Sequence, residues 1–185
     1  IEPKLVADQS TTVRYAIADF MTSLWQSVAI ILVVSFIALG VRAGLVVALA
    51  IPLTLAIVFA LMDVANIDMQ RVSLGALIIA LALLVDDAMT TTDATMSRLA
   101  AGDPKEVAAT YAYKQYAIAM LAGTFVTIAG FVPIGFAASS AGEYTFSLFA
   151  VVGIALIVSW FVAVIFSPLL GVWILKPPKN AGEQK

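Results

Sequence analysis

Five long apolar runs, separated by short polar breaks, constrain this chain more than any other feature. The runs cover about 23–39, 43–62, 72–92, 117–136 and 146–174. A helix needs about 20 mostly apolar residues to cross the hydrocarbon core of a bilayer, and each run is close to that length. Because 62% of the residues are apolar and only 12% are charged, a soluble domain of this size could not cover its own exterior with polar groups. We therefore predict an all-α membrane protein, a bundle of five transmembrane helices.

Composition also excludes several classes of function. A net charge of −2 does not supply the basic face that nucleic acid requires, so we expect no nucleic-acid partner. The sequence contains no cysteine and no histidine, which removes thiolate and imidazole ligands, and we expect no metal and no cofactor. The sequence shows neither a nucleophile–base pattern nor a nucleotide-binding loop. We therefore do not expect an enzyme.

Basic residues predict the orientation of the spans, because cytoplasmic loops carry an excess of Lys and Arg. Seven basic residues fall on the side of the first and third loops and the C-terminal tail: Arg42, Arg98, Lys105, Lys114, Lys176, Lys179 and Lys185. The opposite side carries three, namely Lys4, Arg14 and Arg71. This asymmetry predicts a cytoplasmic C-terminus, with residues 179–185 as a cytoplasmic tail, and an N-terminus outside. Residues 13–178 would form the bundle in the lipid bilayer.

An N-terminus outside the cell requires an export signal or an earlier span. Residues 1–22 are polar and mixed in charge, and they lack the basic and apolar regions of a signal peptide. The sequence also begins with Ile rather than Met. We therefore expect it to be a piece of a longer protein, in which at least one helix precedes residue 1.

Two adjacent carboxylates, Asp86 and Asp87, interrupt the third apolar run. Asp86 follows Val72 by 14 residues, about 21 Å along a helix, which places the pair inside a hydrocarbon core about 30 Å thick. An aspartate at the middle of a membrane helix costs about 2.5 to 3.5 kcal/mol, so two in succession indicate a functional site. Because the two charges repel and burial disfavours both, we expect a coupled pair that binds and releases protons near physiological pH. None of the five runs supplies a Lys or Arg at this depth as a counter-ion.

An alternative is that the helix ends near Val85, which would put both aspartates in a cytoplasmic loop. Against it, the hydroxyls of residues 90–92 can bond to helix carbonyls and allow the helix to continue. Asp93 lies seven residues from Asp86 and therefore on nearly the same helix face. Together with Thr90 it is a candidate proton path toward the cytoplasm, or simply a charge at the end of the helix.

Prolines mark further positions of interest. Pro52, Pro133 and Pro168 lie within apolar runs, where proline forms either a hinge or a kink whose freed carbonyl is satisfied by neighbours. In the break at 101–106, the order of residues predicts that Asp103 caps a new helix whose first residue is Pro104.

The sequence around the carboxylates resembles the fourth transmembrane helix of resistance–nodulation–division (RND) transporters, in particular the inner-membrane component of multidrug efflux pumps. The similarity covers roughly residues 13–178. Its motifs occur in the expected order: the turn at Arg42, Pro52, the small-residue run from Ser73 that leads to Leu-Leu-Val-Asp-Asp-Ala at 83–88, Phe-Val-Pro at 131–133, and Ser-Pro-Leu at 167–169.

The resemblance implies a subunit of two repeated halves, in which this chain corresponds to helices two to six of the first half. Residues 1–12 would be the end of a truncated periplasmic domain. Asp86 and Asp87 would be the proton relay, and a lysine from the second half would be their counter-ion. It further implies drug/proton antiport in the bacterial inner membrane, a trimer, and a periplasmic adaptor and outer-membrane channel as partners. The alternative function is a truncated structural or assembly subunit of a larger membrane complex, without transport activity.

Overall fold

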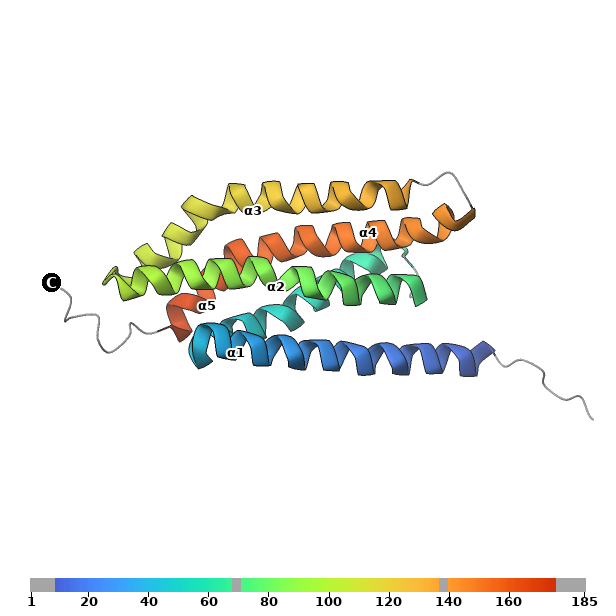
Figure 1. Ribbon diagram of the computed structural model, residues 1–185, viewed down its shortest axis with the longest axis horizontal. Helices are drawn as coiled ribbons and strands as arrows, with labels where there is room; N and C mark the ends of the chain where they lie inside the picture. The colour runs from blue at the N-terminus through green and yellow to red at the C-terminus, as the bar shows by residue number, and fades with distance from the viewer. Residues whose placement is uncertain (1–8, 68–70, 137–139, 176–185) are drawn as a thin grey trace, which may run out of the picture.

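The computed structural model describes residues 9–67, 71–136 and 140–175. The helices are α1 (Gln9–Val64), α2 (Arg71–Ala100), α3 (Lys105–Gly135), α4 (Ser140–Phe161) and α5 (Ser167–Ile174), and a π-helical segment η1 (Val162–Phe166) joins the last two. The long helices lie side by side along one axis (Figure 1). Among the described residues, four helical stretches are long and apolar enough to cross a membrane, the last of them running from α4 through η1 to α5. The predicted all-α membrane fold is therefore confirmed.

Helix α1 contains two of the five predicted spans. Its 56 residues would measure about 84 Å as a straight helix, far more than a hydrocarbon core of about 30 Å. Helical geometry breaks at Gly40, where φ is 79° and ψ is 169°, and the two halves of α1 fold back on one another (Figure 1). This backbone region is essentially restricted to glycine. The turn expected at Arg42 is thus made by Gly40 alone, because Gly40 is the residue within α1 whose φ and ψ are not helical.

The helices extend beyond the apolar runs that predicted them. Helix α1 begins at Gln9 rather than near residue 23, α2 continues to Ala100 rather than 92, and α3 begins at Lys105 rather than near 117. An apolar run measures the length in contact with lipid, whereas polar residues can continue the same helix into water. Residues 1–8 and the expected cytoplasmic tail at 179–185 lie outside the described residues.

The turn between α2 and α3 corrects one prediction. Gly102, with φ of 93°, donates its N–H to the carbonyl of Leu99, and Asp103 donates its N–H to that of Arg98. These two bonds close the end of α2 in the manner of a Schellman motif. The expectation that Asp103 caps α3 is wrong: Pro104 flanks that helix without a side-chain cap. The Asp103 carboxylate instead lies 3.7 Å from the Arg98 guanidinium, which the final turn of α2 brings within reach.

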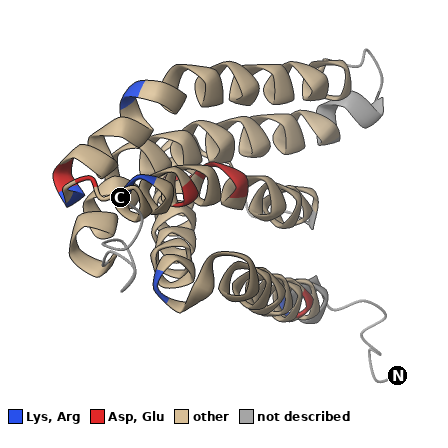
Figure 2. Cartoon of the chain, turned by 60° about the vertical axis from the view of Figure 1, so that its left-hand side comes forward, with Lys and Arg blue, Asp and Glu red and all other residues tan. Residues whose placement is uncertain are grey.

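Two basic side chains join the elements at this end of the bundle. The Arg98 guanidinium lies 3.7 Å from the ring centroid of Tyr111 in α3. Lys105 donates from Nζ to the carbonyl oxygen of Val172 in the last turn of α5, at 3.1 Å. A cation at that position satisfies a carbonyl that the helix itself leaves free. Figure 2 shows that the positions of Lys and Arg concentrate toward this end of the bundle, as the assignment of basic residues to the first and third loops predicted.

Helix α2 lies at the centre of the bundle and packs most extensively against α4 and α1. The main core contains Leu77 and Leu81 of α2 and Val151 and Val152 of α4, all fully buried. Helix α3 packs mainly on α4, and its apolar portion is the least covered of the four long helices. The carboxylate-bearing helix is therefore held from several sides, whereas α3 presents most of its surface to the surroundings.

The prolines differ in their local geometry. Pro168 lies two residues after the end of η1, and Ser167 between them donates its N–H to the carbonyl of Val162, five residues earlier. Proline has no N–H to continue the α-helical ladder, and a π-turn is one recognised way to accommodate such a break. Pro52 lies within α1, where Gly40 is the non-helical residue, and Pro133 lies in the last turn of α3. Whether any of the three prolines acts as a hinge stays a prediction.

Candidate functional site

The adjacent carboxylates lie at the middle of an unbroken helix. Asp86 is 15 residues from the first residue of α2 and 14 from its last. The threonines that follow donate their hydroxyls to helix carbonyls: Thr90 to Asp86 at 2.8 Å, Thr91 to Asp87 at 2.9 Å, and Thr92 to Ala88 at 2.7 Å. The predicted back-bonding is confirmed. The alternative in which the helix ends near Val85 is wrong.

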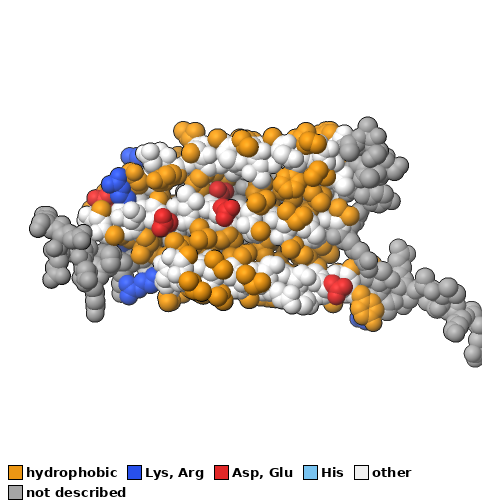
Figure 3. Space-filling view, viewed as in Figure 1, with side chains coloured by type: hydrophobic (Ala, Val, Ile, Leu, Met, Phe, Trp, Pro, Cys, Tyr) orange, Lys and Arg blue, Asp and Glu red, His pale blue; other side chains and the backbone are white. Residues whose placement is uncertain are grey.

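Asp86 lies on the only face of α2 that the described part of the chain leaves uncovered. The exposed residues of this helix recur at spacings of three or four: Ile79, Ala82, Asp86, Thr90, Asp93, Ser97 and Ala100. Such spacing defines a single stripe along a helix, which we call the open stripe. Asp87, the next residue, is half-buried at its edge. Figure 3 shows acidic side chains on this face, between the two ends of the bundle and beside apolar ones.

The structure brings the predicted site residues together only in part. Thr90 and Asp93 share the open stripe with Asp86, as their spacing predicted, and a rise of about 1.5 Å per residue places Asp93 about 10 Å from Asp86 along the helix. Pro52, Pro133 and Pro168 belong to α1, α3 and α5 and lie outside the stripe.

No counter-ion accompanies the carboxylates within the described part of the chain. The ion pair found there joins Arg98 to Asp103 at the end of the bundle. No Lys or Arg of the described ranges pairs with Asp86 or Asp87, and these ranges hold no group of three or more acidic residues that could bind a metal ion. An uncompensated carboxylate at this depth is costly, so the pair requires either a proton or a cation from elsewhere.

Two hydrogen bonds join α4 to neighbouring helices, and the first of them reaches α2 close to the carboxylates. Ser159 of α4 donates its buried hydroxyl to the carbonyl of Leu84, two residues before Asp86, at 2.8 Å. Trp160 donates its indole N–H to the carbonyl of Ala117 in α3, also at 2.8 Å. Sequence reasoning missed both residues. The signal for Ser159 was a hydroxyl inside an apolar run, because such a group needs a partner when it is buried.

Replacing Ser159 by Ala should destabilise the bundle modestly. Hydrogen bonds between membrane helices are worth about 0.6 kcal/mol on average and at most about 1.7 kcal/mol. We expect a small fall in Tm, measured by circular dichroism of the purified protein in detergent. Thr127→Ala is the matched control, because the Thr127 hydroxyl is exposed and bonds only to Gly123 of its own helix. An equal fall in both variants would contradict a role for the Ser159 bond in joining α4 to α2.

The sequence model of the AcrB/AcrD/AcrF family matches residues 1–185. The chain belongs to this family. It is similar to the multidrug resistance protein MdtC of Yersinia pestis bv. Antiqua (strain Angola), with 29% identity over 190 residues that cover 100% of this chain and 18% of the relative. The MdtC protein of Pantoea ananatis (strain AJ13355) is also 29% identical, over 178 residues that cover 96% of this chain and 17% of the relative. The chain thus spans less than a fifth of the length of these curated relatives.

Family membership confirms the resemblance to RND multidrug efflux transporters. Together with the apolar helices, it identifies a multi-pass protein of the bacterial inner membrane.

Proposed function

We propose that this chain forms the proton-coupling part of a drug/proton antiporter driven by the proton-motive force, and that it is not an enzyme. The observation that carries the proposal is the position of Asp86 and Asp87, at mid-length of α2 and on or beside the open stripe. Carboxylates at this depth in a membrane protein are typical of proton relays. The matched relatives are named multidrug resistance proteins, which supports efflux as the transport that the protons drive.

The open stripe supports a second element of the proposal, that further transmembrane helices cover it and supply a lysine. A deprotonated carboxylate needs such a cation at this depth, whereas a protonated one does not. Proton binding would therefore weaken the ion pair between this lysine and α2, and it would shift the equilibrium between two positions of the helix. Because the Ser159 hydroxyl joins α4 to α2 next to the carboxylates, the two helices would move together.

Thr90 and Asp93 extend the proposed path along the open stripe. They lie on the side of Asp86 that leads to the basic end of the bundle, where α2 meets α3. The excess of Lys and Arg favours a cytoplasmic location for that end, and hence for the C-terminus, with the N-terminus in the periplasm. Thr90 and Asp93 would then conduct protons between the pair and the cytoplasm.

Family membership also supports the remaining parts of the proposal, namely a trimer with a periplasmic adaptor and an outer-membrane channel. The alternative of a structural or assembly subunit is not favoured, because the family match runs over the whole chain and includes both carboxylates.

The test is transport by the full-length protein reconstituted in liposomes that contain a fluorescent drug-like dye. Dye movement should begin when a pH gradient is imposed and stop when a protonophore collapses it. Movement that is independent of the gradient would contradict proton coupling.

A further inference from the structure

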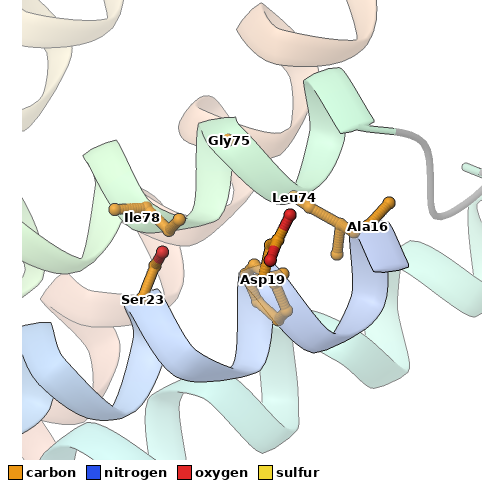
Figure 4. A pocket seen from close by; sticks show the side chains of 7 residues that line it. Ala16, Asp19, Ser23, Leu74, Gly75 and Ile78 are labelled. Atoms are coloured by element: carbon orange, nitrogen blue, oxygen red, sulfur yellow. The ribbon is translucent and has the colours of Figure 1, made fainter. Parts of the chain in front are cut away.

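A groove opens between the beginnings of α1 and α2, at the end of the bundle opposite the α2–α3 turn. Its volume is about 260 Å³, and four residues of α1 and three of α2 line it. Figure 4 shows the Asp19 and Ser23 side chains directed from α1 toward α2, beside Leu74 and Ile78. The groove lies at the start of α2, whereas Thr90 and Asp93 lie in the second half of that helix. No residue of the proposed proton path lines the groove.

The polar lining of the groove has one sign of charge. The Asp19 carboxylate is exposed and has no ion-pair or hydrogen-bond partner within the described ranges. Ser23 lies four residues further along the same helix, about 6 Å deeper, and no Lys or Arg is among the described residues that line the groove. The remaining walls are apolar and include Phe20, Leu74 and Ile78. By charge complementarity, the occupant has a cationic head and an apolar body.

Glycine leaves part of this space open. A Cβ atom built on Gly75 would meet nothing within 4 Å, and Gly75 does not have the positive φ that would require glycine. Backbone conformation therefore does not explain why glycine occupies position 75. The volume that a larger side chain would occupy is instead part of the groove.

The depth of the groove favours a lipid over a water-soluble cation. Gly75 precedes Asp86 by 11 residues, about 17 Å along α2, which places the groove near the edge of a hydrocarbon core about 30 Å thick. Lipid headgroups lie at this level. Along the groove, the Asp19 carboxylate lies toward the helix starts beside Leu74, and the Ser23 hydroxyl lies deeper beside Ile78 (Figure 4). A carboxylate followed by a hydroxyl matches an ammonium followed by the phosphate or ester oxygens of a lipid, with apolar side chains beside both.

We propose that this groove binds a phospholipid with a primary ammonium headgroup, such as phosphatidylethanolamine. The ammonium donates N–H bonds to Asp19, the Ser23 hydroxyl donates to a phosphate or ester oxygen, and the start of an acyl chain lies over Gly75 and Ile78. A trimethylated headgroup has no N–H to donate, and an anionic headgroup is repelled by Asp19. The volume is smaller than the roughly 300 to 1,000 Å³ of sites that enclose a drug-sized ligand, so it accommodates only part of a lipid.

The test places the full-length protein in nanodiscs of equal parts dioleoyl-phosphatidylethanolamine, dioleoyl-phosphatidylcholine and dioleoyl-phosphatidylglycerol. After transfer to detergent, native mass spectrometry counts the lipids that remain bound. We expect the ethanolamine lipid to be enriched roughly 2- to 5-fold over the other two, the range for an interfacial ion pair. Asp19→Asn should abolish the enrichment. Asp63→Asn should keep it, because Asp63 is an exposed carboxylate near the same end that does not line the groove.

A second variant tests the groove itself. Gly75→Leu should fill the space and lower retention of the ethanolamine lipid to the level of Asp19→Asn. If that variant does not elute as a monodisperse protein, Gly75→Ala introduces a single methyl group into the same space, and we expect partial loss of the enrichment.

Three results would overturn the proposal. The first is equal retention of all three lipids by the wild type, and the second is unchanged enrichment in Asp19→Asn. The third needs a lipophilic cationic dye added to the nanodiscs: it is loss of bound dye, rather than of bound ethanolamine lipid, in Gly75→Leu. The last result would assign the groove to a transported cation. Because Asp19 is not on the proposed proton path, proton-driven efflux should continue in Asp19→Asn, and the two proposals can fail independently.

Discussion

Replacing either Asp86 or Asp87 by Asn is expected to abolish proton-driven efflux by the full-length protein. Asparagine has nearly the same shape as aspartic acid but cannot release a proton, so each variant resembles a permanently protonated state. A positioned proton-transfer group typically contributes about 10²- to 10⁴-fold to a rate, and we expect a loss of at least about 100-fold. The measurement is the initial rate of dye efflux from proteoliposomes after a pH jump.

Controls separate this effect from misfolding. Neither carboxylate has a side-chain partner among the described residues, so the variants leave the packing within this part of the protein intact, and the Tm of each variant is measured beside its efflux rate. Asp63→Asn removes an exposed carboxylate outside the open stripe and should transport normally. Asp93→Asn should slow efflux less than either central variant, because Asp93 lies on the proposed path to the cytoplasm and not in the carboxylate pair itself. Undiminished efflux with both Asp86→Asn and Asp87→Asn would refute the proton-relay assignment.

Replacing Gly40 by Ala is expected to destabilise the protein through backbone strain. At φ 79° and ψ 169°, any side chain strains the backbone, at a cost of about 1 to 3 kcal/mol. A Cβ at this position would meet no atom within 4 Å, so the cost arises from the backbone and not from a clash. Because this residue reverses the chain between two spans, relief of the strain would also disturb their packing. Thermal unfolding in detergent, followed by circular dichroism, measures the change in Tm.

Gly123→Ala is the matched control for the Gly40 variant. Gly123 lies within α3, has no positive φ, and a Cβ built on it also meets nothing within 4 Å. Alanine should therefore be neutral or should stabilise the helix by up to about 1 kcal/mol. If the two variants lost equal stability, the conformation of Gly40 would not be the cause.

The sequence by itself determined the class of protein and the number of spans. Lengths of apolar sequence and the cost of a buried charge are local properties, so runs such as 72–92 predicted membrane helices without knowledge of their neighbours. The same reasoning identified Asp86 and Asp87, because a carboxylate pair in an apolar run is expensive wherever the helix packs. It failed at Asp103, whose partner depends on where the preceding helix ends.

Only the tertiary structure decided which helix faces are covered. The open stripe exists because α1, α3, α4 and α5 all pack on the other sides of α2. The sequence of α2 does not predict which of its sides these helices cover. The bond from Ser159 to Leu84 joins residues 75 positions apart, and the groove brings Asp19 of α1 to Gly75 of α2. Such pairings depend on how side chains from distant segments fit together, and hydrophobic periodicity does not encode that fit.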